Sequence, residues 1–317
     1  MGELDPRDEQ RHTPDDSELW NESYYFDWFN DDLSVGGYVR VGFYPNMDRV
    51  WYWACLVGPG RQLVSVVEHD VAMPRSATSL DLRYDGLWAD HVVESPNEHM
   101  SINLEAFALR VDDPTEMYRP EPRGERIPFG FELDFETDRL PYMWPDVTPR
   151  YEIPCRVHGS VQVGSETIRV DGWGQRDHSW GAARDWWSIG WSWTAGRLED
   201  GTRWHTAGGF FSDDPWGVAY ELAPDSADFA EHGAVFIHAD EGADGLPLRS
   251  RTRFGDLTLD FEPVAFAPVL LVHPDGRQSR FPRAMCRVVT ADGRRGAGWI
   301  EWNQPPNRAV PQFAPVG

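Results

Sequence analysis

The stretch DGWGQRDHSWGAARDWWSIGWSWTAG, residues 171–196, contains six tryptophans, two arginines and one histidine. Between residues 187 and 194 large and small side chains alternate, which is the period of a β-strand whose two faces differ. Trp187, Trp191 and Trp193 then lie on one face. The stretch therefore predicts a strand with an aromatic face. Along the rest of the chain this period of two recurs, whereas the helical period is almost absent.

Tight turns separate the alternating segments. Asp-Gly, the dipeptide that supplies the positive φ angles of two-residue hairpins, predicts antiparallel strands joined by short turns. We therefore expect an all-β fold with enough strands for two barrels or sandwiches. The turn at residues 199–201 returns the chain so that His205 pairs back against Trp191 and Trp193. The six dipeptides begin at Asp85, Asp171, Asp200, Asp244, Asp275 and Asp292.

The chain length of 317 residues exceeds the usual size of one hydrophobic core, so we expect two domains. The first 20 residues are acidic and lack an apolar segment, and they predict a disordered leader rather than a signal peptide. Prolines and charges interrupt the strand pattern before residue 150. The sequence therefore places the two domains at residues 21–150 and 151–317.

The formal net charge is -23 at pH 7, from 52 acidic residues against 29 basic residues. Such a charge repels nucleic acid, so a nucleic-acid partner is excluded. The basic residues are all arginine. The absence of lysine also excludes a Schiff base, a pyridoxal-phosphate anchor and the phosphate-binding lysines of Walker-type ATPases and protein kinases.

The cysteines Cys55, Cys155 and Cys286 lie far apart without C-x-x-C spacing, which favours a reduced cytoplasm. No stretch approaches the roughly 20 apolar residues that span a bilayer. The histidines lack the spacings of zinc sites. No glycine-rich strand-to-helix turn indicates nicotinamide or flavin binding. We expect a soluble cytoplasmic monomer or homodimer with no metal, no cofactor and no membrane insertion.

Charged residues gather at the centre of the opening stretch. Arg176, Asp177 and His178 are consecutive, between glycines at 172, 174 and 181 that permit bulges or bends at a strand end. An aspartate beside a histidine and an arginine can orient the imidazole and tune the pKa of the carboxyl. A buried structural ion network has the same composition, and from the sequence both interpretations stay open.

These residues belong to a longer pattern. G-x-G-x-R-D-H-S-W-G at 172–181 is followed by R-D-W-W at 184–187, G-W-x-W at 190–193 and G-x-G-W-I-E-W-N at 296–303. The pattern resembles the AttH-like and hydroxyneurosporene synthase (carotenoid hydratase) superfamily, which is similar in turn to certain fungal Diels–Alderases. The resemblance implies two lipocalin-like antiparallel β domains in tandem, with a ligand site between or inside them.

The resemblance also implies acid-initiated chemistry. Asp177, His178 and Trp180 match the D-H-x-W core of the family. Many relatives carry glutamate directly before that tryptophan, where this chain has Ser179, so Asp177 or, less favourably, Asp185 must supply the acid. Protonation of an alkene requires a carboxylic acid that a dry pocket keeps neutral, and the neighbouring Arg176 opposes this.

We expect a cofactor-independent hydratase, lyase, isomerase or cyclase acting on a hydrophobic isoprenoid- or polyketide-like molecule. Indole faces would stabilise a developing carbocation, at about 0.5–2 kcal/mol per ring. Catalytic roles fall to Arg176, Asp177, His178 and Asp185. The residues expected to bind substrate are Tyr25, Trp28, Trp180, Arg184, Trp187, Trp191, Trp193, His205 and Glu301.

Two other functions remain compatible with the same residues. A non-catalytic lipocalin-like binder of an apolar metabolite would use the tryptophans as pocket walls and the charges to hold the sheet together. A carbohydrate-active protein would stack sugars on the indoles and use paired carboxylates for cleavage.

Overall fold

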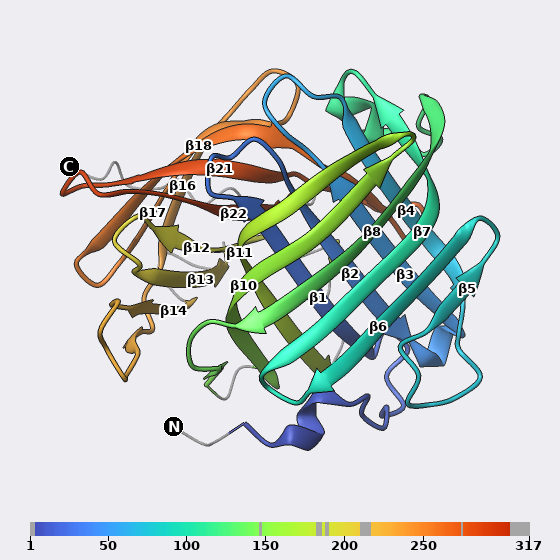
Figure 1. The fold of residues 1–317 in the computed structure, drawn as a ribbon, viewed down its shortest axis with the longest axis horizontal. Helices are drawn as coiled ribbons and strands as arrows, with labels where there is room; N and C mark the ends of the chain where they lie inside the picture. Colours follow the sequence, from blue (N-terminus) through green and yellow to red (C-terminus); the bar gives the residue numbers. More distant parts are fainter. Residues whose placement is uncertain are drawn as a thin grey trace. The chain divides into compact units, whose positions relative to one another are not determined.

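The computed structural model describes residues 4–145, 148–181, 186–187, 190–209, 217–273 and 275–304. Figure 1 shows these residues as strands in antiparallel sheets, with only three short 3-10 helices, η1 (Pro6–Glu9), η2 (Pro45–Met47) and η3 (Pro114–Tyr118). The prediction of an all-β fold is confirmed. Within the described part of the chain, no helix has the length and hydropathy that a membrane crossing requires.

Contacts within the chain define two compact units. Unit 1 comprises Met1–Leu56, Gln62–Asp112 and Gly124–Arg184. Unit 2 comprises Val57–Arg61, Asp113–Arg123 and Asp185–Gly317.

Unit 1 is built around a closed antiparallel barrel. Its hydrogen-bonded order is β4-β3-β2-β1-β11-β10-β8-β7-β6-β5, and β4 also pairs with β7, which closes the circuit. Strands β5 and β6 form a hairpin beside β7, and β9 pairs with β10. The strands are β1 (Asn21–Asn30), β2 (Gly36–Tyr44), β3 (Arg49–Leu56), β4 (Leu63–Ala72), β5 (Leu82–Tyr84), β6 (Leu87–Ser95), β7 (His99–Val111), β8 (Glu125–Thr137), β9 (Tyr142–Met143), β10 (Arg150–Val163) and β11 (Glu166–Gly181).

The closing strands of the barrel explain where the chain divides. The sequence placed the boundary at residue 150, but the structure assigns β10 and β11 to unit 1. Strand β10 pairs with β8, and β11 pairs with both β10 and β1. Without these two strands, β1 and β8 would expose unpaired edges, so the barrel needs them.

Alternation fills the inside of this barrel with apolar side chains. Tyr24, Phe26 and Trp28 of β1 face Val39 and Val41 of β2 in one buried cluster. Burial of each such side chain stabilises the fold by about 1.5–3 kcal/mol. Trp28, which we predicted to contact substrate, is therefore a core residue of unit 1.

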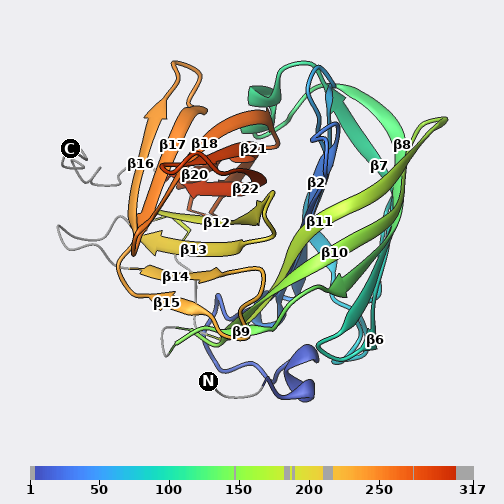
Figure 2. The same ribbon diagram turned by 60° about the vertical axis from the view of Figure 1, so that its left-hand side comes forward.

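Unit 2 contains a nine-stranded antiparallel sheet in the order β15-β14-β13-β12-β22-β21-β18-β17-β16, and β19 pairs with β20 (Figure 2). Its buried cluster includes Trp204, Trp302 and Phe261. The strands are β12 (Trp191–Leu198), β13 (Arg203–Gly209), β14 (Gly217–Leu222), β15 (Ala230–His232), β16 (Phe236–Glu241), β17 (Pro247–Phe254), β18 (Leu257–Phe266), β19 (Val269–Val272), β20 (Gln278–Phe281), β21 (Arg283–Thr290) and β22 (Arg295–Asn303).

The predicted aromatic hairpin is present, but its first strand begins later in the sequence than predicted. Strand β12 begins at Trp191, and Trp187 lies in a turn before it. Strand β13 returns beside β12 through the predicted Asp200–Gly201 turn, but His205 stands opposite Ala195, whereas Trp193 stands opposite Ala207. The rings of Trp193 and His205 lie 5.5 Å apart between centroids.

Five of the six Asp-Gly dipeptides lie in turns between paired strands, and their glycines have positive φ. The exception is Asp171–Gly172, which lies inside β11. A Cβ at Gly172 would collide with the carbonyl of Phe29, and one at Gly174 would collide with the carbonyl of Asp27. These glycines therefore permit close approach of β1 rather than the predicted bulge, whereas Gly181 has φ 106° and ends the strand.

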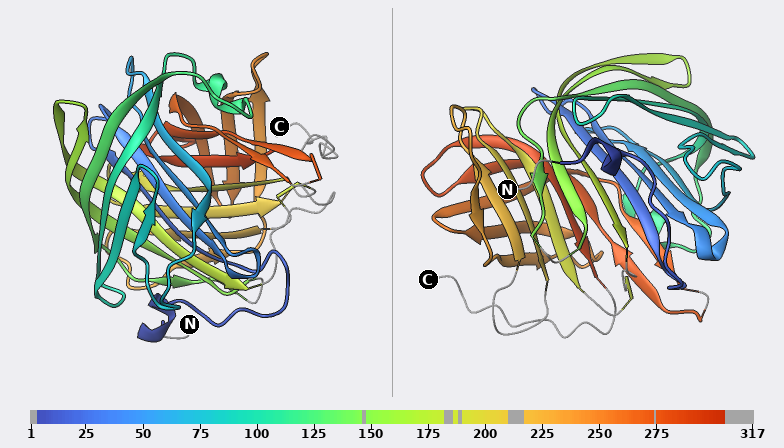
Figure 3. Two further views of the ribbon diagram at one scale, coloured as in Figure 1. Left: turned by 90° about the vertical axis from the view of Figure 1, so that its right-hand side faces the viewer. Right: turned by 90° about the horizontal axis from the view of Figure 1, so that it is seen from below.

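The acidic leader is ordered over residues 4–20, although the sequence predicted disorder. It carries η1, and Leu4 and Glu9 are buried against unit 1. Figure 3 shows this segment, in dark blue, at one end of the barrel strands. The segment is ordered because Glu9 pairs with Arg176 of β11. Composition alone cannot predict such a partner.

Candidate functional site

Strand β11 carries the central residues of the predicted site on two different faces. Arg176 and His178 stand opposite Phe26 and Tyr24 of β1, two residues of the barrel core. Asp177 lies between them in sequence, so its side chain points to the other face of the sheet. The structure therefore does not join Asp177 and His178 in one acid–base site, which corrects the prediction.

Two clusters result, one on each face of the sheet. The inner cluster faces the barrel core, and the opposite-face cluster lies on the other side of β1, β10 and β11. The inner cluster consists of Glu9, His12, Glu22, Arg176 and His178, and the opposite-face cluster consists of Asp27, Arg150, Glu152, Gln175 and Asp177.

In the inner cluster Arg176 is neutralised by Glu9. Its Nη1 donates to Glu9 Oε1 at 2.8 Å and to Oε2 at 3.0 Å, and both side chains are buried. Burial lowers the pKa of Arg176, but the Glu9 charge outweighs burial and leaves the pKa raised. Glu9 also accepts a hydrogen bond from the backbone N of Asn97 at 3.1 Å. This pair is a structural contact between the leader and the barrel.

His178 is held at both ring nitrogens. Its Nδ1 lies 2.7 Å from the backbone carbonyl of Asp8, and its Nε2 lies 3.0 Å from Glu22 Oε1. A carbonyl only accepts, so Nδ1 carries a proton. The imidazole stacks on Tyr24, with centroids 3.9 Å apart. His178 is thus fixed in place. Its ring is buried on the other face of the sheet from Asp177, so the two side chains do not form an acid–base pair.

Glu22 accepts from two histidines. His12 Nδ1 lies 2.6 Å from Glu22 Oε1, and the backbone N of His12 donates to both carboxylate oxygens. Burial raises the pKa of Glu22, but hydrogen bonds from His12 and His178 outweigh burial and leave the pKa lowered. Trp180, predicted to bind substrate, stacks on His12 at 3.9 Å between centroids.

On the opposite face Arg150 bridges two carboxylates. Its Nη2 donates to Asp177 Oδ2 at 2.6 Å, and its Nε donates to Glu152 Oε1 at 2.7 Å. Gln175 Nε2 donates to the second oxygen of Glu152 at 3.1 Å. The sequence left open whether Asp177 is an acid or an arginine partner. The structure makes it an arginine partner, with Arg150 rather than Arg176.

Asp27 is the remaining carboxyl of this cluster. It is 1% exposed, and its Oδ1 accepts a hydrogen bond from the backbone N of Gln175 at 3.1 Å. Burial raises the pKa of Asp27 well above its ordinary value, and the charges of Glu152 and Asp177 raise it further. Hydrogen bonds from the backbone of Gln175 and from the side chain of Tyr25 oppose this without cancelling it. Burial and the two neighbouring carboxylates therefore favour the protonated form of Asp27.

Aromatic rings accompany Asp27 on this face. Tyr38 stands opposite Asp27 across β1 and β2, and Tyr25, two residues before Asp27, shares its face. Tyr25 and Tyr38 are buried, with ring centroids 6.3 Å apart. Tyr25, which we predicted to bind substrate, therefore lies on the face of the acid.

The remaining predicted residues belong to unit 2 or lie outside the described residues. Trp187, Trp191, Trp193, His205 and Glu301 are in unit 2, where Glu301 forms a buried ion pair with Arg283. Glu301 stands opposite Trp193 in the pairing of β12 with β22. Arg184 and Asp185 lie outside the described residues. The motif that the sequence presented as one site is thus divided between the two units.

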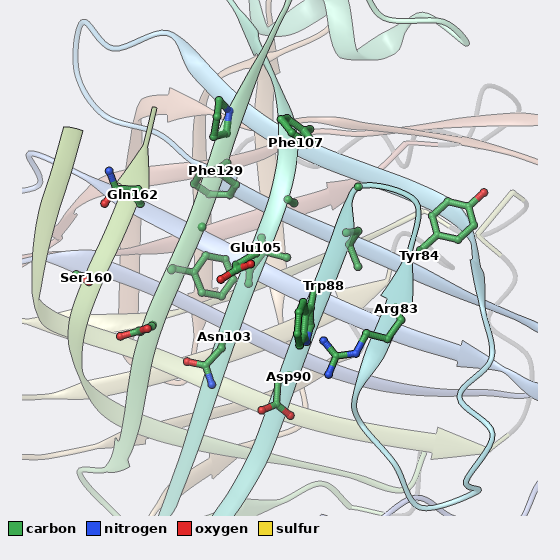
Figure 4. A pocket seen from close by; sticks show the side chains of 18 residues that line it. Arg83, Tyr84, Trp88, Asp90, Asn103, Glu105, Phe107, Phe129, Ser160 and Gln162 are labelled. Carbon is green, nitrogen blue, oxygen red and sulfur yellow. The ribbon is translucent and has the colours of Figure 1, made fainter. Parts of the chain in front are cut away.

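Unit 1 also has an open groove of about 860 Å³ on the outside of β6, β7 and β8. Figure 4 shows Trp88 and Phe107 standing from neighbouring strands, with Asp90, Asn103 and Glu105 beside them. Trp88 is 52% exposed and Phe107 is 55% exposed. None of the residues predicted from the sequence lines this groove.

Solved structures define the class of fold. A protein provisionally named AttH from Nitrosomonas europaea is 14% identical, with a TM-score of 0.69 over 95% of this chain and 97% of that chain. CghA in complex with Sch210972 is 10% identical, with a TM-score of 0.59 over 91% of this chain and 89% of that chain. Kievitone hydratase from Nectria haematococca is 10% identical, with a TM-score of 0.58 over 90% of each chain.

These likenesses confirm the resemblance to the AttH-like and hydratase fold, and at such identities they concern the fold alone. The chain belongs to the family described as a domain of unknown function, DUF7064, whose model matches residues 5–306. Comparison with curated proteins gave no match.

Sequence reasoning missed Glu9, Glu22, Arg150 and Glu152 as members of these clusters. Glu9 lies in the leader, where acidic composition hid a buried ion pair. The signal for Glu22 was present in NESYYFDWFN, because a carboxyl within an apolar strand needs a partner. The identity of that partner depends on which strands are neighbours.

Proposed function

We propose that this protein is a hydratase- or cyclase-type enzyme that applies the acid–base chemistry of its own carboxyl groups to an apolar small molecule. The observation that carries the proposal is Asp27, a carboxyl that is 1% exposed and whose pKa is raised by burial. Pairs of carboxyl groups whose environments separate their pKa values supply acid and base at one pH. The fold that the chain shares with kievitone hydratase and CghA supports the same class of activity.

Asp27 is the proposed general acid. Its carboxyl proton would pass to an alkene carbon in a hydration or cyclisation, or to a leaving hydroxyl in the reverse direction. In hydration, the attacking water would then lose a proton to the carboxylate of Glu152 or Asp177. Proton transfer back to Asp27 within the cluster completes the cycle without an external acid.

Tyr25 and Tyr38 provide ring faces on the side of the sheet where the positive charge would develop. A ring stabilises a cation by about 0.5–2 kcal/mol when well placed. These rings take the role that we assigned from the sequence to Trp180 and the tryptophans of unit 2. An isoprenoid- or polyketide-like substrate fits this chemistry, because its alkenes give cations that a water-excluding aromatic site protects.

The experiment is a search for turnover in D2O with a panel of isoprenoid and polyketide-like alkenes, followed by mass spectrometry. Hydration or cyclisation through Asp27 places one solvent deuteron on a product carbon. The Asp27→Asn variant should still quench tryptophan fluorescence with the same alkene but give no product. Quenching by both proteins with no product from either would identify a binder instead of an enzyme.

A second candidate function rests on the groove of Figure 4. Trp88 and Phe107 are exposed beside Asp90, Asn103 and Glu105, an arrangement suited to stacking a sugar ring and to hydrogen bonding its hydroxyls. The proposal here is binding of soluble oligosaccharides by unit 1. Titration calorimetry with a panel of oligosaccharides tests it, and Trp88→Ala should abolish any binding found. Binding that survives this change would place the sugar elsewhere.

A further inference from the structure

Three segments of unit 1 bring two imidazoles and one carboxylate together. His12 comes from the leader, Glu22 from β1 and His178 from β11, and one donor atom from each lies within 4.8 Å of the other two. His12 Nδ1 and His178 Nε2 approach the same oxygen, Glu22 Oε1, at 2.6 Å and 3.0 Å. Two imidazole nitrogens and one carboxylate oxygen form a ligand set that suits zinc and its neighbours in the first transition row.

The ring of His178 is oriented as in metal-binding histidines. Its Nδ1 donates to the backbone carbonyl of Asp8 at 2.7 Å, and such a bond to the far nitrogen fixes the tautomer of a ligating imidazole. The other nitrogen, Nε2, therefore faces Glu22 Oε1 and would be the atom that coordinates an ion once its proton is displaced.

The remaining contacts hold the other two donors in place. Both oxygens of Glu22 accept from the backbone N of His12, at 2.9 Å and 2.8 Å, so the carboxylate cannot rotate away. Trp180 stacks on His12 with an interplanar angle of 7°. Tyr24 stacks on His178. These contacts preorganise the ligand atoms, which lowers the cost of assembling a site around an ion.

We propose that His12, Glu22 and His178 form a binding site for one zinc-class divalent ion that fastens the leader to the barrel. A tetrahedral zinc ion with ligand distances near 2.1 Å separates its donor atoms by about 3.4 Å. The His178–Glu22 pair needs little change. The His12 ring must shift by on the order of 1 Å to bring its donor atom to this spacing from both partners, which lie within 4.8 Å of it. The ring belongs to the leader, and its side chain is 24% exposed. Water takes the fourth position on this exposed side.

The test is zinc binding by the full chain after dialysis against chelator, with cobalt(II) as a spectroscopic substitute. We expect one ion per chain, the visible absorption of tetrahedral cobalt, and a rise in Tm with zinc that grows with its concentration. Loss of one partner outside the ligand set weakens metal sites by 10–100-fold, so His12→Ala should weaken binding by at least about 100-fold.

A matched control is His99→Ala. His99 Nε2 lies 2.8 Å from Asp134 on the surface of unit 1, so this pair would bind adventitious metal if histidine–carboxylate pairs alone sufficed. His99→Ala should leave the affinity unchanged. His12→Cys should keep cobalt binding and add thiolate-to-cobalt absorption, which a merely structural histidine would not do.

Two outcomes overturn the inference. One is the absence of saturable zinc or cobalt binding by the wild-type chain. The other is an affinity that His12→Ala leaves unchanged while its far-ultraviolet circular dichroism stays native. Because the ligand set excludes Asp27, both results are independent of the D2O experiment on the proposed enzyme.

Discussion

The two faces of β11 hold buried charges under opposite conditions. On the inner face, Arg176 pairs with Glu9, and Glu22 contacts two histidines. On the opposite face, Arg150 donates to Asp177 and Glu152, whereas the third carboxyl, Asp27, has hydrogen bonds from Gln175 and Tyr25. Except for His12, the members of both clusters are buried. The difference teaches that the pKa of a buried carboxyl depends on its partners: hydrogen bonds from histidines leave the pKa of Glu22 lowered, whereas burial and neighbouring carboxylates leave the pKa of Asp27 raised.

The largest effect should come from removing the proton of Asp27. If the proposed function is right, Asp27→Asn lowers turnover by about 10²–10⁴-fold, the range of general acid catalysis, because the amide cannot supply a proton. The free energy of unfolding at pH 4, where the contribution of Asp27 is still almost complete, should change by less than about 1 kcal/mol, because the amide has nearly the shape of the neutral acid. Asp134→Asn, a partly exposed acid on β8, should change neither quantity. Turnover by Asp27→Asn equal to that of the wild type would show that Asp27 is not the general acid.

The inner face should respond in stability instead. Arg176→Met leaves the Glu9 carboxylate buried without its counter-charge, and breaking such an ion pair costs about 3–5 kcal/mol. Adding Glu9→Leu to Arg176→Met should recover most of this loss, because an apolar pair needs no counter-charge. Urea denaturation measures both variants, with Arg169→Ala as an exposed control. A loss below about 1 kcal/mol in the single variant would show that the pair is not an anchor.

The pH dependence of stability separates the two faces further. The pKa of Asp27 is raised in the folded protein, so above its unfolded value of about 3.9 the folded state retains a proton that the unfolded state has lost. Stability from this group is therefore complete below pH 4 and falls by about 1.4 kcal/mol per pH unit until Asp27 ionises in the fold.

The Asp27→Asn variant should not show this decrease in stability with rising pH. Between pH 5 and pH 7 the variant should gain stability relative to wild type, by at most about 3 kcal/mol. The other charged groups on this face, Arg40, Arg150, Glu152 and Asp177, are present in both proteins and cancel in the difference. Denaturation curves at the two pH values measure it, and parallel curves for the two proteins would contradict the raised pKa.

The smallest effect concerns the glycines that let β11 approach β1. Gly172→Ala and Gly174→Ala each place a Cβ against a backbone carbonyl, and such overpacking costs about 1–3 kcal/mol. Gly174 lies against the carbonyl of Asp27, so Gly174→Ala should also lower turnover, whereas Gly172→Ala should not. Gly233→Ala, where a Cβ meets nothing within 4 Å, serves as the control. Equal turnover by Gly172→Ala and Gly174→Ala would show that the backbone position of Asp27 does not affect the reaction.

The sequence located the hairpins well and the leader poorly. Asp200–Gly201 formed the predicted turn and set His205 beside Trp193, because turn type and strand pairing are local. The leader was predicted to be disordered because its residues are acidic, yet Glu9 and His12 find partners on β11 and β1. Composition measures the average solubility of a segment, whereas order here depends on two individual ion pairs.

The candidate site shows the same limit. The alternation that predicted strands also requires Asp177 and His178 to face opposite sides, so that correction was available from the sequence. The sequence could not predict that Asp177 pairs with Arg150 rather than Arg176, because this pairing depends on β10 lying beside β11. The raised pKa of Asp27 was not predicted from the sequence, because it depends first on burial and then on the charges of Glu152 and Asp177, which lie on other strands.

The sequence by itself determined the all-β class, the positions of most turns, the exclusion of lysine chemistry and the likeness to the AttH-like fold. These follow from the period of side chains, the conformational freedom of Asp-Gly and the presence or absence of residue types, which neighbours do not alter. Only the tertiary structure decided that the barrel closes with β10 and β11, that the leader is anchored and that the pKa of Asp27 is raised. Those outcomes depend on which distant charges share a dry face, and Coulomb interactions and desolvation act through space and not along the chain.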